Sequence, residues 1–302
     1  MSKYLVTGGA GFVGTNLIKQ LLSRGDEVIV IDNYYAGKLA SRIQPGVNYV
    51  EGDIRNIEDL NKVMVGVDGV FHLAAIARVF YSVENPKETN DVNIGGTLNV
   101  LIAARDNGVK RVVYSASSAA YGNQKILLLS ETMKPSPISP YGLQKYVGEE
   151  YARLFYELYG LNTVSLRYFN IYGSGMDPNG AYALVIGKFL QQKKEGKPLT
   201  ICGDGEYYRD YTNVYDIARA NIIAMDSEKV GHGEVINIGN GTPFSVNQLA
   251  KTIGGEYVHI EARPGDPRHT QADNTKAKEL IGWQPTIDLA AGIAELKKEL
   301  GL

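Results

Sequence analysis

The sequence of 302 residues contains a single cysteine, Cys202. One thiol excludes an internal disulfide and is compatible with a reducing cytoplasm. A lone cysteine is more often packed in a core than used as a nucleophile, so no thiol chemistry is predicted. The histidines are also few, and no two of them have a metal-binding spacing such as H-E-x-x-H. We therefore predict no metal site. The histidines are His72, His232, His259 and His269.

Long apolar runs and a strong charge imbalance are missing too. No apolar stretch approaches the roughly 18 residues of a membrane span. The chain begins with a strand-like segment, Tyr4–Val6, rather than a basic leader. We therefore expect no signal peptide, no membrane insertion and a cytoplasmic location. The formal net charge of −2 gives no reason to expect nucleic-acid binding.

The composition, 44% hydrophobic and 21% charged, is that of a globular chain long enough for one large or two modest domains. The first half alternates continuous apolar runs with helical patterns, which is typical of a parallel sheet covered on both faces. This alternation predicts an α/β fold with a Rossmann-type, doubly wound parallel sheet. The expected strands are Tyr4–Thr7, Glu27–Ile31, Asn48–Glu51, Val70–His72, Val112–Ser115 and Thr163–Leu166. The expected helices are Phe12–Ser23, Ile57–Val63, Val92–Asn107 and Pro140–Tyr159.

Glycine, proline and serine support these helix ends. Gly25 and Gly108 follow their helices at the C′ position, and Pro140 suits a first turn capped by Ser139. After about Phe169 glycine and proline become frequent and strands become short. We predict a first domain of residues 1–171 and a smaller α/β substrate domain of residues 172–302. A crossing of the chain back to the first domain is left open.

A glycine-rich turn joins the first expected strand to the first helix, with the sequence TGGAGFVG over residues 7–14. Gly8, Gly11 and Gly14 follow the G-x-x-G-x-x-G spacing, and Phe12 and Val13 open the helix. Glycine lets the backbone approach a pyrophosphate, which helix N-terminal amides then bind. The context predicts a dinucleotide cofactor.

The ends of the next strands supply further cofactor residues. Asp32 ends the second strand, where a carboxylate accepts both ribose hydroxyls of NAD and repels a 2′-phosphate. Asn33 follows it with no arginine nearby in sequence, so we predict NAD rather than NADP. Asp53, followed by Ile54, is expected either at the adenine amino group or as a loop cap. After His72, which we interpret as structural, small residues would line the cofactor; the segment is Leu73, Ala74 and Ala75.

The catalytic candidates are Ser117, Tyr141 and Lys145. Ser117 lies in a serine cluster at residues 115–118, and Tyr141 and Lys145 are four residues apart on an expected helix, on one face. A free tyrosine, with a pKa of about 10, is a poor base at neutral pH. A nearby ammonium and a positive nicotinamide ring would favour the phenolate. We therefore predict that Tyr141 is a general acid/base.

Together these motifs resemble the extended short-chain dehydrogenase/reductases, and later segments resemble the nucleotide-sugar 4-epimerases, most closely those acting on UDP-N-acetylglucosamine. The resemblance covers essentially the whole chain. The later segments are Arg167–Gly173, Asp177–Tyr182, Gly203–Gly205 with Arg209-Asp210, and Arg263–Asp266.

The resemblance implies roles for residues across the chain. Ser117, four residues before Tyr121, would bind the sugar O4 and relay protons with Tyr141. Asn170 would bind the diphosphate, Arg209 and Arg263 would grip the UDP phosphates, and Asp266 would lie near the uridine ribose. Two further sets complete the expected site: Tyr168 at the cofactor, and Ala181 and Tyr182 at the substrate.

The resemblance also bears on the reaction. Ala119 and Ser118 occupy the positions where dehydrating and decarboxylating relatives carry an acid or base, which argues against those activities. Thr270 matches a position where a small residue admits a 2-acetamido group, so UDP-N-acetylglucosamine is expected to fit. Two departures from the epimerase pattern are Ala116, in place of a common serine, and an apolar loop at residues 125–129, which affects the expected shape of the sugar pocket.

The implied reaction is reversible inversion at sugar C4 through a 4-keto sugar, with the hydride passing to NAD and back. The alternatives are a UDP-glucose 4-epimerase with little N-acetyl tolerance, a net dehydrogenase or reductase that releases NADH, and a non-catalytic NAD-sensing protein. The family pairs through two long helices, here about 92–107 and 140–159, so a homodimer is expected. Its apolar candidates are Val147, Ala152, Phe155 and Tyr156.

Overall fold

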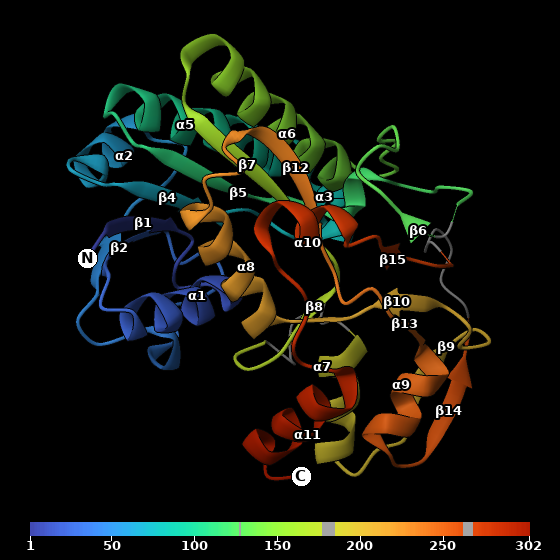
Figure 1. Cartoon of the computed structure of the whole chain (residues 1–302). Helices are drawn as coiled ribbons and strands as arrows, with labels where there is room; N and C mark the ends of the chain where they lie inside the picture. The colour runs from blue at the N-terminus through green and yellow to red at the C-terminus, as the bar shows by residue number, and fades with distance from the viewer. Residues whose placement is uncertain (127, 177–184, 262–267) are drawn as a thin grey trace.

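The computed structural model describes residues 1–126, 128–176, 185–261 and 268–302, and its centre is a seven-stranded, all-parallel sheet (Figure 1). The strand order is β12-β7-β5-β4-β1-β2-β3. The chain winds outward from β1 through β2 and β3, then returns to build the other side from β4. The carboxyl ends of β1 and β4 therefore flank a switch point, where open α/β sheets form their ligand crevice. The strands are β1 (Lys3–Thr7), β2 (Glu27–Asp32), β3 (Asn48–Glu51), β4 (Gly69–His72), β5 (Arg111–Ser117), β7 (Asn162–Tyr168) and β12 (His232–Ile238).

Helices cover both faces of this sheet, which confirms the predicted doubly wound architecture (Figure 1). Alternate residues of β1 point to opposite layers: Val6 packs in one core with α1 and α8, and Leu5 packs in the other with α2, α5 and α6. Burial on both faces explains why the strands are apolar without interruption. The helices are α1 (Phe12–Ser23), α8 (Val214–Asp226), α2 (Ile57–Met64), α5 (Thr97–Asp106) and α6 (Pro140–Tyr159).

The ends of α6 follow local chemistry. Ser139 is the N-cap and its hydroxyl accepts a hydrogen bond from Gly142 N at 3.1 Å, with Pro140 at the first helical position. Gly160 ends the helix in the left-handed conformation, with φ of +69°. The predicted bounds of α1, α6 and β3 are those observed.

The helix predicted at residues 92–107 is an α-helix only from Thr97 to Asp106. Before Thr97 the chain passes from α4 (Pro86–Asn90) through a π-helical segment, Asp91–Gly96, into α5. The buried Asn93 explains the widened turn, because its side chain accepts from Ile76 N at 2.8 Å and donates to Gln144 Oε1 at 2.9 Å. Widened turns of this kind are frequent at functional sites. A short helix before it, α3 (Val79–Glu84), was not predicted.

The second half builds its own core and also completes the sheet. Residues from α7, α9 and α11 pack with Leu199 and Ile201 in a separate cluster, at the lower right of Figure 1. Yet β12 pairs with β7, and α8 packs on α1, although both follow residue 172. The chain therefore returns to the first unit, and the boundary at residue 172 stays a prediction. The remaining elements are β6 (Leu128–Leu129), β8 (Ile171–Tyr172), α7 (Val185–Lys194), β9 (Leu199–Cys202), β10 (Tyr208–Asp210), β11 (Thr212–Asn213), β13 (Pro243–Ser245), α9 (Val246–Ile253), β14 (Tyr257–Ile260), β15 (Gln271–Ala272), α10 (Thr275–Ile281) and α11 (Leu289–Leu300).

The described residues contain neither a membrane-spanning helix nor a cluster of metal ligands. Across these four ranges, none of the helices combines the length and apolar character that a membrane crossing requires. In the same ranges, no three His, Cys, Asp or Glu side chains are grouped as a metal site would need.

Candidate active site

The predicted site residues gather at one edge of the sheet because parallel strands end on the same side. Gly8 follows β1, Asp32 ends β2, Leu73 follows β4 and Ser117 ends β5. Asn170 lies just after β7, which pairs with β5 in the register Ser117 to Tyr168. The same edge of the sheet thus brings together residues as far apart in sequence as Gly8 and Asn170.

The glycine turn lies tightly against the loop after β4. Gly8 has φ of +71°, and a Cβ on it would stand 2.8 Å from both Ala74 Cα and Ala74 N. A Cβ on Gly14 would stand 2.6 Å from Gly8 O. Gly11 is the N-cap of α1 and has no side chain to cover the amides of Phe12 and Val13. The cradle therefore leaves backbone at the helix N-terminus for the cofactor pyrophosphate, so the residues fit NAD.

Asp32 links the glycine turn to the loop that follows β2. Its Oδ2 accepts from Ala10 N at 3.0 Å and its Oδ1 accepts from Tyr34 N at 2.8 Å. Each carboxylate oxygen has a second lone pair, so these bonds leave capacity for ribose hydroxyls. The side chain is partly exposed. Its position at the end of β2 is the one that the NAD prediction requires.

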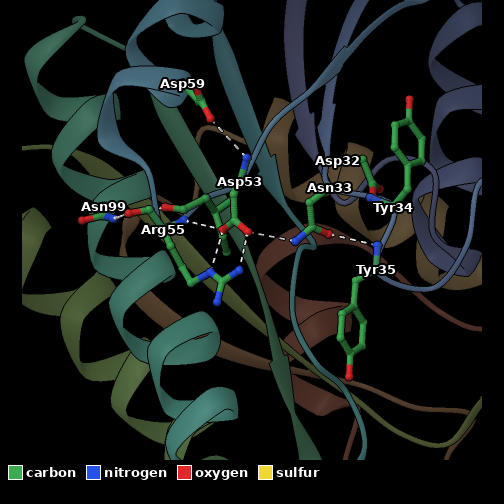
Figure 2. Close-up of polar contacts among 9 residues, drawn as sticks. Asp32, Asn33, Tyr34, Tyr35, Asp53, Arg55, Asp59 and Asn99 are labelled. Carbon is green, nitrogen blue, oxygen red and sulfur yellow. Dashed lines mark hydrogen bonds and ion pairs between the residues drawn. The ribbon is translucent and has the colours of Figure 1, made fainter.

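Asp53 is held within its own loop. Figure 2 shows the Arg55 guanidinium on both carboxylate oxygens, with Nε at 3.0 Å and Nη2 at 2.7 Å, and Asn33 Nδ2 at 3.0 Å. Arg55 is the main reason that the pKa of Asp53 falls to about 2. These bonds favour the loop-cap alternative, and an adenine contact stays a prediction. Ile54 is buried against Gly96, where a Cβ would stand 2.5 Å from Ile54 Cδ1.

The catalytic candidates come together at the start of α6. Tyr141 N donates to Ser82 Oγ at 3.0 Å, and the Tyr141 side chain hydrogen-bonds Ser117. Lys145 is 3% exposed and donates from Nζ to Ser115 O at 2.6 Å. Its ammonium lies 4.9 Å from the centroid of the Tyr114 ring, which gives it a cation–π contact. The sheet edge and one turn of α6 therefore fix all three groups.

The pKa values of this group differ from the sequence expectation. Burial raises the pKa of Tyr141, and the hydrogen bond from Ser117 opposes that rise only in part. Burial lowers the pKa of Lys145 to about 7, with the Glu149 carboxylate acting in the opposite direction. Lys145 is aimed at Ser115 O, and its charge is not a cause of the Tyr141 shift. The phenolate form of Tyr141 therefore needs a further positive charge.

His72, predicted to be structural, and Tyr168, predicted at the cofactor, both lie in the protein core. His72 is 1% exposed and hydrogen-bonds Thr7 Oγ1 at 2.8 Å and Thr97 Oγ1 at 2.9 Å. Burial lowers its pKa to about 3, so it is neutral, as a structural histidine should be. Tyr168 donates to Asn221 Oδ1 on α8 at 2.8 Å, which places its hydroxyl in the core under the sheet.

The predicted substrate residues that the structure describes meet beside β10. Asn170 Nδ2 donates to Asp210 O at 3.1 Å and lies 3.5 Å from Thr270 Oγ1. Arg209 precedes Asp210 and is partly exposed. On the cofactor side, the predicted cofactor residue Ala75 is partly exposed in the loop after β4. The remaining substrate predictions lie outside the described residues; they are Ala181, Tyr182, Arg263 and Asp266.

Asp210, to which we assigned no role from the sequence, holds this part of the site together. Its buried carboxylate accepts from Asn240 N at 2.6 Å, Gly241 N at 2.9 Å and Ala272 N at 2.9 Å. Burial raises its pKa to about 6, and those amide bonds oppose the rise. The carboxylate thereby ties β10 to the turn after β12 and to β15. Three segments that carry or flank substrate residues share this one anchor.

A second unpredicted group lies behind Lys145. Glu149, one turn further along α6, makes a two-point ion pair with Arg167 on β7, at 2.9 Å and 2.6 Å. Both side chains are at most 3% exposed. The spacing of four between Lys145 and Glu149 is a signal that sequence reasoning could have used, because it places both on one helix face.

Comparison with known proteins agrees with this geometry. The model of the NAD dependent epimerase/dehydratase family matches residues 4–239. A UDP-glucose 4-epimerase of Mycolicibacterium smegmatis is 35% identical over 96% of each chain. The structure of a UDP-glucose 4-epimerase of Thermotoga maritima with UDP-glucose superposes with a TM-score of 0.93 at 39% identity, covering 99% of each chain. A UDP-N-acetylglucosamine 4-epimerase of Methanobrevibacter ruminantium M1, in complex with UDP-N-acetylmuramic acid, has a TM-score of 0.91 at 35% identity, again over 99% of each chain.

Proposed function

Because the chain belongs to the NAD dependent epimerase/dehydratase family, we propose that it catalyses the reversible, NAD-dependent inversion of a UDP-sugar at C4. Similarity to UDP-sugar 4-epimerases over nearly the whole chain supports the reaction class. The observation that carries the chemistry is the meeting of Ser117, Tyr141 and Lys145 at the end of β5.

In this proposal Tyr141 exchanges a proton with the sugar O4, and Ser117 orients that hydroxyl. The hydrogen bond between Ser117 and Tyr141 favours the phenolate. Lys145 in its protonated form would place a positive charge close to the reacting groups, and the hydrogen bond to Ser115 O fixes its position. NAD⁺, when bound, takes up and returns the C4 hydride, and its nicotinamide ring supplies the further positive charge that Tyr141 needs. The glycine turn and Asp32 would hold it.

Inversion requires that the sugar ring expose both faces, so binding energy belongs on the UDP group rather than on the ring. We propose that Asn170, Arg209 and Arg263 bind the diphosphate of UDP. Asp266 is proposed to bind near the uridine ribose. The buried Asp210 keeps the chain segments of Asn170 and Thr270 together through the contacts described above. A rigid nucleotide site beside a roomy sugar pocket is what the reaction needs.

We propose further that UDP-N-acetylglucosamine is a substrate. Thr270 is a small, partly buried residue next to Asn170, at the position expected to give room to a 2-acetamido group. The UDP-glucose 4-epimerase structure is similar at 39% identity, so UDP-glucose is the second candidate substrate. Release of NADH and a purely NAD-sensing role are alternatives that the same assays would reveal.

Enlarging residue 270 tests this substrate proposal. In Thr270→Tyr, kcat/KM for UDP-N-acetylglucosamine should fall about tenfold or more because the ring fills the acetamido space, while UDP-glucose is still converted. Thr270→Ser is the matched control and should keep both activities. An equal loss for both sugars in Thr270→Tyr would contradict the assignment of this position.

We also propose a homodimer formed through the outer surfaces of α5 and α6. Two of the four apolar candidates, Ala152 and Phe155, are buried in the chain's own core and are not available. Tyr156 is partly exposed but lies on the inward side of α6, where its ring contacts His232. Val147 is partly exposed and Leu143, one turn before it, is 50% exposed, so these two residues share the outer face of the helix. An apolar face of this kind is a reasonable basis for an interface between copies.

A further inference from the structure

The buried ion pair between Glu149 and Arg167 has no part in binding or chemistry as described so far. Glu149 is 1% exposed and Arg167 is 3% exposed. Burying two charges costs free energy that their attraction repays only with good geometry, and apolar residues often replace such a pair without loss. Here the geometry is two-point, with Nε to Oε1 at 2.9 Å and Nη2 to Oε2 at 2.6 Å. The pair is therefore either a structural cross-link between α6 and β7 or a source of charge for a neighbour.

That neighbour is Lys145. Lys145 and Glu149 are four residues apart on α6, and both side chains are buried on the face that packs against β5 and β7. Two opposite charges at this spacing attract each other, and burial strengthens the attraction. Lys145 itself is bound at Ser115 O, 2.6 Å away. A carbonyl oxygen accepts a hydrogen bond from either form of the amine, so it does not fix the charge by itself.

The other groups around Lys145 contribute little negative charge. On β5 the Tyr114 ring lies at 4.9 Å, and its hydroxyl donates to Lys145 O at 3.3 Å. On β4 His72 is neutral, because burial and the charge of Lys145 hold its pKa at about 3. Tyr141 lies one turn before Lys145, and its pKa is raised by burial. Glu149, one turn after Lys145 on the same face of α6, is thus the acidic side chain that acts on Lys145, and it is paired with Arg167 on β7.

We propose that Glu149, held in place by Arg167, is a positioning residue whose carboxylate keeps the buried Lys145 side chain in its charged form beside Tyr141. The inference rests on the proposed function for the roles of Tyr141 and Lys145. Arg167 is itself anchored: its guanidinium lies 4.5 Å from the centroid of the Tyr121 ring, and the Tyr121 hydroxyl donates to Asn237 Oδ1 at 2.7 Å. Asn237 Nδ2 in turn donates to Leu129 O at 2.8 Å. The carboxylate is therefore fixed from strands β7 and β12 and cannot turn away from the helix face.

The test compares Glu149→Gln with Glu150→Gln. Both changes remove one negative charge from the same helix, but the Glu150 side chain is 42% exposed and pairs with Arg153 at 2.9 Å. In wild type, the Lys145 Cε signal of ¹³C-lysine-labelled protein, identified by its loss in Lys145→Met, should titrate near pH 7. In Glu149→Gln the midpoint should fall by about one pH unit, and the alkaline limb of kcat should fall with it while KM changes little. Glu150→Gln should move neither.

A purely structural ion pair predicts a different result. It would reduce stability and the amount of active enzyme without moving the Lys145 midpoint or the alkaline limb, and that outcome would overturn the proposal. If Glu149→Gln does not fold, Glu149→Gln is made in the Arg167→Met background and compared with Arg167→Met alone, so that the two proteins differ only in the Glu149 charge; equal Lys145 midpoints would also overturn the proposal. Glu149→Asp keeps the carboxylate, so its Lys145 midpoint should lie between those of wild type and Glu149→Gln. If wild type converts neither UDP-sugar, the proposed function fails, whereas the lysine titration still decides this inference.

Discussion

At the scale of single residues, burial determines how the ionisable groups beside the cofactor crevice behave. His72, Tyr141 and Lys145 lie within one layer of side chains between the sheet and the surrounding helices. Burial moves all three pKa values toward the neutral form. Only groups with a fixed charge nearby recover the charged form. For this reason we assign the structural role to His72 and the charged role to Lys145.

His72 should make the fold sensitive to acid. Its pKa is about 3 when folded, against an ordinary value of 6.5 when unfolded. Stability from the neutral ring is complete above pH 6.5 and is lost as the pH falls toward 3, because the unfolded chain takes up the proton first. Between pH 6.5 and pH 5 the loss should be about 2 kcal/mol.

Urea unfolding at pH 7 and pH 5 measures the free energy of unfolding of wild type and His72→Gln. His72→Gln cannot titrate, so its stability deficit relative to wild type should shrink by about 2 kcal/mol at the lower pH. His259→Gln, at an exposed histidine, is the control for the substitution itself. A deficit for His72→Gln that stays constant between the two pH values would contradict the assignment.

At the scale of elements, the glycine turn is the joint between β1, α1 and the loop after β4. Sequence spacing alone predicted the turn, since glycines at these positions have few other uses between a strand and a helix. The spacing did not show that Gly8 lies against Ala74, because that contact joins segments far apart in the chain.

Gly8→Ala should displace the turn and weaken NAD binding about tenfold or more, since misplaced amides no longer meet the pyrophosphate. The matched control is Gly25→Ala. Gly25 has φ of +81°, comparable to the +71° of Gly8, but a Cβ there would have nothing within 4 Å. Both variants should lose about 1–2 kcal/mol to backbone strain. Only Gly8→Ala should raise the Kd for NAD in a calorimetric titration. Equal Kd values for the two variants would contradict the proposal that the glycine turn binds the NAD pyrophosphate.

At the scale of the whole molecule, most of the sheet and its cofactor edge could be predicted because six of its strands and their helices show local patterns of apolar runs and capping residues. What could not be predicted depends on pairings across the fold. Arg167 and Glu149 meet only when β7 lies beside α6, and Asp210 acquires its role only when β15 lies beside β10. Likewise, β12 belongs to the main sheet only because it pairs in parallel with β7, which would otherwise be the edge strand.

The proposed dimer belongs to this scale as well. We expect a mass near twice 33.0 kDa in light scattering after size-exclusion chromatography. Leu143→Asp should shift the protein to monomer by placing a charge in the apolar face of α6. Val65→Asp is the control, because Val65 is 68% exposed at the end of α2. A monomeric wild type would contradict the dimer without affecting the proposed chemistry.

The proposed inversion of a UDP-sugar at C4 by Ser117, Tyr141 and Lys145 can be measured in a single assay. Purified wild type and Tyr141→Phe are incubated with UDP-N-acetylglucosamine and, separately, with UDP-glucose, first without and then with added NAD, and the products are followed by NMR. We predict that the galacto epimer of UDP-N-acetylglucosamine appears with wild type and that Tyr141→Phe, which keeps the cofactor site, forms almost none. No conversion of either sugar by wild type even with NAD, or near-normal turnover by Tyr141→Phe, would contradict the account.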